Sequence, residues 1–188
     1  MLTRTVFLDR DGVINYDSPD YIKSWEEFRF LPGSLAAIRR LTRHGFTIIV
    51  ITNQSAIARN MITPDGLETI HRNMKTAVAS HGGRITDIFF CPHLPEDGCD
   101  CRKPRPGMIQ NALKHYDIDL SRAYMVGDSA KDIQCARNAA CGGAVLVRTG
   151  NGMKTERALK DGQALPDYTA ENLLEAADWI IRQQENVV

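Results

Sequence analysis

The chain has 188 residues, of which 43% are hydrophobic and 24% are charged, and its 23 basic residues balance 23 acidic ones. This length and composition predict a single domain over residues 1–188, and the formal net charge of zero excludes the strongly basic surface of most nucleic-acid-binding proteins. The chain also contains no apolar run of the roughly 18 residues that a membrane-spanning helix needs, and its first residues lack the pattern of a signal peptide. We therefore expect a cytoplasmic monomer that binds neither nucleic acid nor a membrane.

Short apolar runs alternate with helical patterns along the chain. The expected strands cover residues 5–8, 46–51, 85–90, 123–126 and 144–147. The expected helices cover residues 34–44, 64–81, 106–116, 129–138 and 171–184. This alternation favours an α/β fold in which a parallel sheet lies between two helical layers, a three-layer αβα arrangement of the Rossmann type. Because Asp9 and Thr52 are only 43 positions apart, we expect no separate cap domain between them.

Polar side chains follow three of the expected strands. Asp9 and Asp11 come directly after the first strand, Thr52, Asn53 and Gln54 follow the second, and Asp128 follows the fourth. Ligands of open parallel sheets bind at the carboxyl ends of the strands. We therefore expect these side chains to meet at one edge of the sheet and to form the active site there.

The two neighbouring aspartates indicate chemistry that depends on a divalent cation. Their carboxylates would repel each other without a cation, and carboxylate oxygens suit Mg²⁺. We expect Asp9 to be the nucleophile and Asp11 the general acid and base, with both residues and Asp128 as magnesium ligands. The structural alternative is an Asp-Gly turn with incidental acidic groups. Asp132 has a structural interpretation as well, because with Ser129 it fits a capping box.

Three further polar residues could hold a phosphoryl group. Thr52 offers a hydroxyl and Asn53 an amide at the end of the second strand, and the structural alternative for both is to cap a helix or a turn. Lys103 lies in a loop flanked by proline and could neutralise negative charge in the transition state. A solvated surface lysine is the alternative for this position.

A second group of candidate ligands is compact in the sequence. Cys91, His93, Cys99 and Cys101 lie within eleven residues. Three thiols and one imidazole are the ligands of a closed, structural zinc site. The alternative is a set of isolated cysteines and a surface histidine, but a loop rich in Gly and Asp is a poor place for buried thiols. We expect structural Zn²⁺ here, which would anchor the segment that follows Cys101.

The motifs DRDGVIN, TNQS, RKP and GDSAKD occur in this order, and with them the chain resembles the haloacid dehalogenase-like (HAD-like) phosphatase superfamily over nearly its whole length. The resemblance implies a magnesium-dependent phosphatase that forms a phospho-aspartate on Asp9 and hydrolyses it with help from Asp11. It also implies that Thr52 and Lys103 stabilise the phosphoryl group and that Asp128 binds the magnesium.

Further motifs resemble one group within that superfamily. The segments CPH, CDCRKPRPGM, TNQSAIAR and VRTGNG are similar to the D-glycero-D-manno-heptose-1,7-bisphosphate 7-phosphatases, which act in the synthesis of heptose precursors for bacterial lipopolysaccharide. This resemblance implies a sugar phosphate as substrate and a role for Arg102 in its recognition. The usual TNQSG pattern has Ala56 in place of Gly here. The polar loop with Asn15, Asp17, Ser18 and Asp20 could receive hydroxyls of a sugar or an amine, or it could simply be solvated.

Three other functions remain open from the sequence, and the first is a broad sugar-phosphate phosphatase that serves no single pathway. Histidinol-phosphate phosphatases share the aspartates and the zinc loop, and their aminoalkyl substrate would need a carboxylate such as Asp17 or Asp20. A catalytically silent zinc-binding interaction domain would typically lack a nucleophile or an acid/base group. The presence of both Asp9 and Asp11 favours an enzyme over such a domain.

Overall fold

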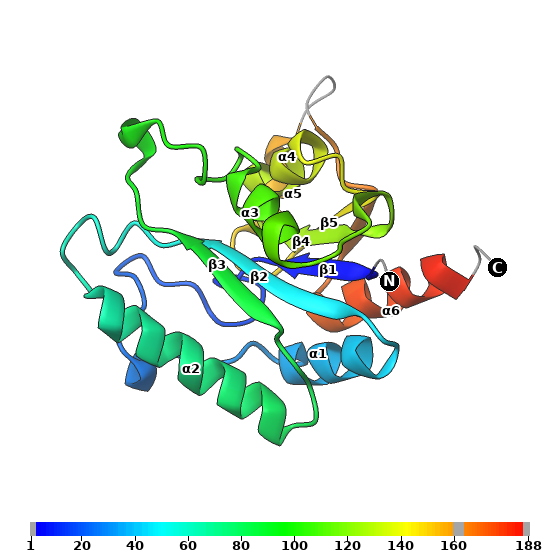
Figure 1. Ribbon diagram of the computed structural model, residues 1–188, viewed down its shortest axis with the longest axis horizontal. Helices are drawn as coiled ribbons and strands as arrows, with labels where there is room; N and C mark the ends of the chain where they lie inside the picture. The colour runs from blue at the N-terminus through cyan, green and yellow to red at the C-terminus, as the bar shows by residue number, and fades with distance from the viewer. Residues whose placement is uncertain (1–2, 160–163, 186–188) are drawn as a thin grey trace.

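In the computed structural model, which describes residues 3–159 and 164–185, a parallel sheet forms the centre of the molecule (Figure 1). Six strands of the described residues pair in the order β3-β2-β1-β4-β5-β6, and every pair is parallel. The strands are β1 (Thr5–Leu8), β2 (Thr47–Asn53), β3 (Asp87–Cys91), β4 (Tyr124–Gly127), β5 (Gly143–Val147) and β6 (Tyr168–Ala170). The expected α/β fold with a parallel sheet is therefore confirmed.

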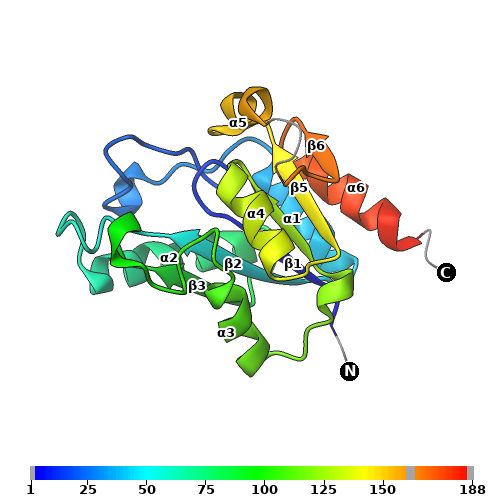
Figure 2. The same cartoon turned by 90° about the horizontal axis from the view of Figure 1, so that it is seen from above.

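Helices cover both faces of this sheet. They are α1 (Ser34–Arg43), α2 (Pro64–Ser80), α3 (Gly107–His115), α4 (Ala130–Asn138), α5 (Gly152–Ala158) and α6 (Leu173–Glu185). Figure 1 shows α1, α2 and α6 on one face of the sheet and α3 and α4 on the other, and Figure 2 shows α4 lying over the central strands. No helix in the described part of the chain is both long enough and apolar enough to cross a membrane.

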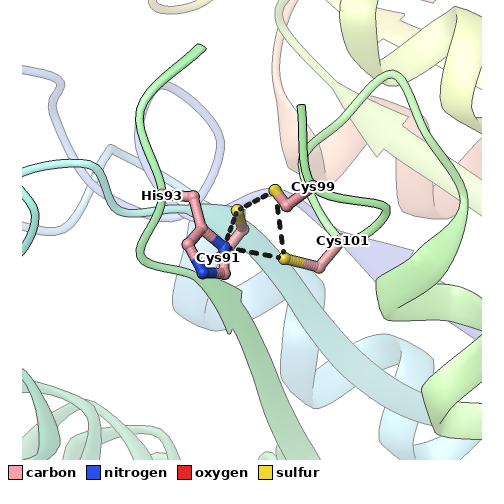
Figure 3. A group of neighbouring side chains, drawn as sticks. All are labelled: Cys91, His93, Cys99 and Cys101. Carbon is pink, nitrogen blue, oxygen red and sulfur yellow. Dashed lines mark hydrogen bonds between the residues drawn. The ribbon is translucent and has the colours of Figure 1, made fainter. Parts of the chain in front are cut away.

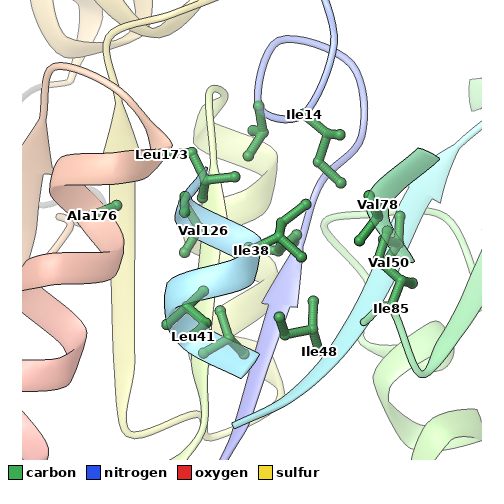
Figure 4. Close-up of a cluster of buried hydrophobic side chains, with 14 of the residues drawn as sticks. Ile14, Ile38, Leu41, Ile48, Val50, Val78, Ile85, Val126, Leu173 and Ala176 are labelled. Atoms are coloured by element: carbon green, nitrogen blue, oxygen red, sulfur yellow. The ribbon is translucent and has the colours of Figure 1, made fainter. Parts of the chain in front are cut away.

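Two hydrophobic cores follow from the alternation of side chains along the strands. In β1, Val6 and Leu8 belong to the core beneath α1, α2 and α6, whereas Phe7 belongs to the core beneath α3 and α4. Figure 4 shows the first core, in which Ile38 and Leu41 of α1 pack against the strands. Each such aliphatic side chain contributes about 1.5–3 kcal/mol when it is fully buried, so the strand positions are held firmly.

The sequence patterns missed two short elements, α5 and β6. Helix α5 has seven residues and follows a glycine-rich turn, and β6 has three residues. A segment this short contains too few residues for a periodic pattern, so its structure depends on the neighbouring β5, with which both elements are in contact. Strand β3 also begins two residues later than expected and ends at Cys91.

The register of the strands places the polar residues side by side. Leu8 of β1 lies opposite Val50 of β2 and Val126 of β4. Asp9 therefore follows β1 close to the carboxyl end of β2, which carries Thr52 and Asn53, and Asp128 follows β4 at the same edge of the sheet. All of these residues come to the carboxyl edge of the sheet, as expected for a ligand site in this class of fold.

Candidate active site

A buried lysine connects two of the aspartates at this edge. Lys103 Nζ lies 2.9 Å from Asp9 Oδ1 and 2.7 Å from Asp132 Oδ1, and it donates a hydrogen bond of 3.0 Å to the carbonyl of Ile51. Burial lowers the pKa of Lys103, but the carboxylates of Asp132 and Asp9 outweigh it and raise this pKa above its usual range. The lysine is therefore a permanent positive charge next to the Asp9 carboxylate.

The end of β2 positions this lysine. The backbone N–H of Lys103 donates to Asn53 Oδ1 at 3.1 Å, and Asn53 Nδ2 donates to the Lys103 carbonyl at 3.3 Å. Asn53, predicted as a substrate ligand, lines the pocket but uses its amide to hold the lysine loop. The buried hydroxyl of Thr52 accepts a hydrogen bond of 2.9 Å from Gln54 Nε2 and also lines the pocket.

Three carboxylates crowd together beside the lysine. Oxygen atoms of Asp9, Asp128 and Asp132 all lie within 4.8 Å of one another. Burial raises the pKa of Asp9 to about 8 against the opposing effect of Lys103, and burial together with Asp132 raises the pKa of Asp128 to about 7. A divalent cation would remove this electrostatic penalty, and the oxygen donors present are those that Mg²⁺ prefers. The residues therefore fit a magnesium ion.

Within this group, Asp132 has a structural task. Its Oδ2 accepts hydrogen bonds from the backbone N–H and the hydroxyl of Ser129, at 3.0 and 2.6 Å, and its Oδ1 contacts Lys103. The capping box predicted at the start of α4 is thus present. Because both oxygens of Asp132 are engaged, Asp9 and Asp128 are the better candidates for magnesium ligands.

Two glycines leave room for the Asp128 carboxylate. A Cβ atom on Gly12 or on Gly150 would lie 2.2 Å from Asp128 Oδ2, and both glycines have a positive φ, of +79° and +56°. The backbone N–H of Asn151 donates to the same oxygen at 2.7 Å, and Asn151 Nδ2 donates to Asp17 at 3.2 Å. The TGNG segment therefore forms one wall of the site, a function that the sequence pattern alone did not indicate.

The Asp11 carboxylate lies outside the acidic group, although the sequence predicted it as a magnesium ligand. It accepts hydrogen bonds from Arg10 at 2.9 to 3.2 Å, from Asn15 at 2.8 Å and from Gln54 at 2.8 Å. Burial raises the pKa of Asp11, but the Arg10 charge and these hydrogen bonds outweigh burial, so this pKa lies below its usual value. These donors hold the carboxylate in its charged form and use both of its oxygens.

The aspartates line a polar pocket with a volume of about 460 Å³. Of the predicted substrate ligands, Asp17, Ser18 and Arg102 also line this pocket, and Arg102 donates a hydrogen bond of 2.9 Å to the His93 carbonyl. Asp20 does not line it; this residue lies in an adjacent groove. The polar loop continues along the pocket with Pro19, Tyr21 and Ile22, and of the substrate ligands predicted in this loop only Asp20 faces away from it.

Several residues of this site escaped the sequence analysis. They are Arg10, Lys131 and Asn151. Arg10 stands inside the DRDG motif and Asn151 inside TGNG, so their positions in motifs were the available signal. Gln54 and Asn15 were expected near the site, but the motifs could not tell that both side chains would donate to Asp11.

The zinc ligands form a compact cluster at the end of β3 (Figure 3). Cys91 Sγ lies 3.6 Å from Cys99 Sγ and 3.6 Å from His93 Nδ1, and Cys101 Sγ lies 3.4 Å from Cys99 Sγ and 3.2 Å from His93 Nδ1. Ligands about 2.3 Å from a central zinc ion are about 3.7 Å apart in a tetrahedron. The cluster therefore fits zinc, as the sequence predicted.

Comparisons with known proteins agree with this geometry. The family described as HAD-hydrolase-like matches residues 100–176. A D-glycero-beta-D-manno-heptose-1,7-bisphosphate 7-phosphatase of Pseudomonas aeruginosa is 48% identical over 164 residues, which are 87% of this chain and 89% of the relative. The phosphatase of the same name from Bordetella bronchiseptica is 45% identical over 182 residues, which are 96% of this chain and 99% of the relative.

A solved structure is similar over nearly the same length. It is the crystal structure of D,D-heptose 1,7-bisphosphate phosphatase from B. bronchiseptica complexed with magnesium and phosphate. Its TM-score to this chain is 0.88 at 43% sequence identity, and the match covers 96% of this chain and 99% of that one. The chain therefore belongs to the D-glycero-beta-D-manno-heptose-1,7-bisphosphate 7-phosphatase family of HAD-like hydrolases.

Proposed function

We propose that this protein removes the 7-phosphate of D-glycero-β-D-manno-heptose 1,7-bisphosphate through a phosphoryl intermediate on Asp9. The observation that carries the proposal is the contact of Asp9 Oδ1 with the buried Lys103 ammonium, 2.9 Å apart, at a polar pocket. A carboxylate next to a fixed positive charge can attack a phosphate without electrostatic repulsion between two anions. The names of the relatives supply the substrate.

The proposed reaction consists of two successive displacements at phosphorus. In the first, a carboxylate oxygen of Asp9 bonds to phosphorus, the bond between phosphorus and the sugar oxygen breaks, and Asp11 gives a proton to that oxygen. In the second, water attacks phosphorus, the phosphorus–Asp9 bond breaks, and Asp11 takes the proton of the water. The charged, hydrogen-bonded Asp11 of this structure is in the state that the second displacement requires. The proton that Asp11 takes from water in that displacement is the one that it gives to the sugar oxygen in the next turnover.

Asp9 and Asp128 would hold the magnesium ion. The contacts of Asp9 with Lys103 and with the Arg10 backbone both use Oδ1, and the contacts of Asp128 with Asn151 both use Oδ2. One oxygen of each aspartate therefore faces no partner among these contacts. When bound, Mg²⁺ supplies positive charge that offsets the charge of the phosphoryl group and of the carboxylates.

Cations at the rim of the pocket suit a second phosphate on the same substrate. Lys131 and Arg102 line the pocket beside the buried Lys103. Asp17 and Ser18 lie on the same rim and offer hydrogen bonds to sugar hydroxyls. We assign Arg102 and Lys131 to the remote phosphate and Asp17 and Ser18 to the sugar. As a single-domain phosphatase acting on a soluble sugar phosphate, the protein is assigned to the cytoplasm and to a monomeric state.

The experiment is phosphate release with Mg²⁺ from both anomers of D-glycero-D-manno-heptose 1,7-bisphosphate and from L-histidinol phosphate. We expect the β anomer to exceed histidinol phosphate by about 100-fold in kcat/KM, which corresponds to about 2.7 kcal/mol of transition-state binding. A preference for the α anomer would change the proposed sugar stereochemistry. A preference for histidinol phosphate would overturn the substrate while leaving the aspartate chemistry in place.

A further inference from the structure

A buried histidine on α2 reaches the active site from a segment that the proposed reaction does not use. His71 lies on the inner face of α2, and its Nε2 is 3.3 Å from Arg10 Nη1. Arg10 is 1% exposed and His71 is 7% exposed, so the contact between them is largely shielded from bulk water. Buried polar groups that lie this close are expected to hydrogen-bond to each other.

The direction of this hydrogen bond follows from the chemistry of the two groups. A guanidinium can only donate hydrogen bonds, so Nη1 of Arg10 donates and Nε2 of His71 accepts. The imidazole is thus neutral, with its proton on Nδ1. Burial and the nearby Arg10 charge lower the pKa of His71 to about 3, which agrees with a neutral acceptor.

The other side of the same guanidinium holds Asp11. Arg10 Nε donates to Asp11 Oδ1 at 3.2 Å, and Arg10 Nη2 donates to Oδ1 at 2.9 Å and to Oδ2 at 3.0 Å. A guanidinium is planar, so a hydrogen bond at Nη1 restricts the orientation of the donors at Nε and Nη2. The position of His71 is therefore transmitted to the carboxylate of Asp11.

We propose that Arg10 and His71 are positioning residues that keep the Asp11 carboxylate oriented for proton transfer from water during hydrolysis of the phospho-Asp9 intermediate. This inference rests on the proposed function, because it assigns the second displacement to Asp11. Without the His71 acceptor, the Arg10 guanidinium would turn toward other acceptors and Asp11 would lose its alignment. A displacement of about 1 Å in a reacting group can cost about 100-fold in rate.

The test compares His71→Leu with His71→Gln. Leucine has no acceptor, whereas the glutamine carbonyl can reach the position of Nε2 and accept from Arg10 Nη1. We expect His71→Leu to lower kcat by at least about tenfold and KM along with it, because only the second displacement is slowed, and we expect His71→Gln to restore most of the loss. In acid-quenched samples taken during turnover of the heptose bisphosphate, mass spectrometry should find a larger phosphorylated fraction of His71→Leu than of the wild type.

Met74→Ala is the matched control for the effect of weaker packing of α2, without loss of a hydrogen-bond acceptor. Met74 is fully buried on the same face of α2, one turn further along the chain, and its thioether makes no hydrogen bond comparable to that of the imidazole. Its replacement should lower the melting temperature without raising the phosphorylated fraction. If His71→Leu and Met74→Ala show the same phosphorylated fraction, or if His71→Gln is as slow as His71→Leu, the positioning inference is wrong.

A failure of the proposed function would look different. Asp11→Asn should accumulate the phosphorylated protein, and Asp9→Asn should form none. If wild-type protein and Asp11→Asn never carry a phosphoryl group while phosphate is released, the proposed mechanism fails, whatever the His71 variants do. If His71→Leu does not fold, the comparison of wild type, His71→Gln and an Arg10→Lys variant decides the question, because lysine cannot make the forked contact with Asp11. Unchanged kcat and phosphorylated fraction in Arg10→Lys would then overturn the inference.

Discussion

The two groups of metal-ligating side chains in this molecule are assembled in opposite ways. The zinc cluster takes its four ligands from residues 91–101, in one loop that begins at the end of β3. The cluster of carboxylates contains Asp9 and Asp128, which are 119 positions apart in the chain. A local cluster needs only the right bends in one loop, whereas the cluster of carboxylates needs the register of β1 with β4. Variants of each group should therefore fail in different ways.

The largest expected effect is the loss of the nucleophile. Asp9→Asn should lower phosphate release by at least about 10⁴-fold, because an amide cannot attack phosphorus as a carboxylate does. The zinc content, measured by atomic absorption, should stay at the wild-type value, since the zinc ligands lie in another segment. Activity in Asp9→Asn within tenfold of the wild type would refute the assignment of the nucleophile.

The next prediction compares a glycine beside the carboxylates with a glycine in the zinc loop. Gly150→Ala should lower activity by about 100-fold and raise the Mg²⁺ concentration needed for half activity, because its Cβ would lie 2.2 Å from Asp128 Oδ2. Gly98 in the zinc loop has a similar φ of +64°, but a Cβ atom there would have no atom of the described residues within 4 Å beyond its chain neighbours. Gly98→Ala should therefore lower the free energy of unfolding by about 1–2 kcal/mol through backbone strain alone. Its Mg²⁺ dependence should be that of the wild type. Equal Mg²⁺ dependence of the two variants would contradict the crowding at Asp128.

Loss of zinc should have a smaller effect on turnover. Cys101→Ser should release zinc and lower kcat/KM by about tenfold, because Cys101 directly precedes Arg102 and Lys103 in the chain. The β-sheet should persist in circular dichroism, since the two hydrophobic cores do not depend on the loop. The control is Cys141→Ala, which removes a buried thiol outside the cluster and should keep the zinc. Full activity in zinc-free Cys101→Ser would show that the loop holds Lys103 without the metal.

The smallest expected effect concerns acid stability. The pKa of His71 is lowered from 6.5 to about 3 in the folded state, so below pH 6.5 the unfolded chain binds a proton that the folded chain does not. The stability that the neutral His71 contributes is therefore fully present above pH 6.5 and is lost as the pH falls toward 3. Between pH 6.5 and about pH 5, the free energy of unfolding of the wild type should fall by about 2 kcal/mol more than that of His71→Gln. Urea unfolding at several pH values measures this difference.

The control for acid stability is His44→Gln at the exposed end of α1. It should lose stability in acid as the wild type does. If His71→Gln and His44→Gln behave alike, the imidazole of His71 is not held neutral by its burial and by Arg10.

Much of the fold could be predicted because its signals are local. The β-branched run of β2 and the amphipathic pattern of α1 each span enough residues to reveal a period, and five of the six described strands were expected. The polar residues after the strands then indicated the edge of the sheet that carries the site. The elements α5 and β6 were missed because each is too short to have a pattern of its own.

The candidate site was predictable only as a set of residues. The motifs named Asp9, Asp11, Lys103 and Asp128 and brought the three aspartates to one metal site, but they did not indicate that Asp132 would join Asp9 and Asp128. The structure groups Asp9 with Asp128 and Asp132, and it turns Asp11 toward Arg10. These orientations depend on side chains that come from distant segments, and sequence spacing carries no information about them.

The sequence by itself determined the order of the elements, the zinc ligands and the residue types at the carboxyl edge, because each depends on neighbours within a few turns or a short loop. Only the tertiary structure decided that His71 supports Arg10 and that Gly150 makes room for Asp128. It also decided that Lys103 lies between Asp9 and Asp132. These contacts arise where helices and loops pack against a sheet of defined register, and the free energy that selects them comes from the burial of the whole core.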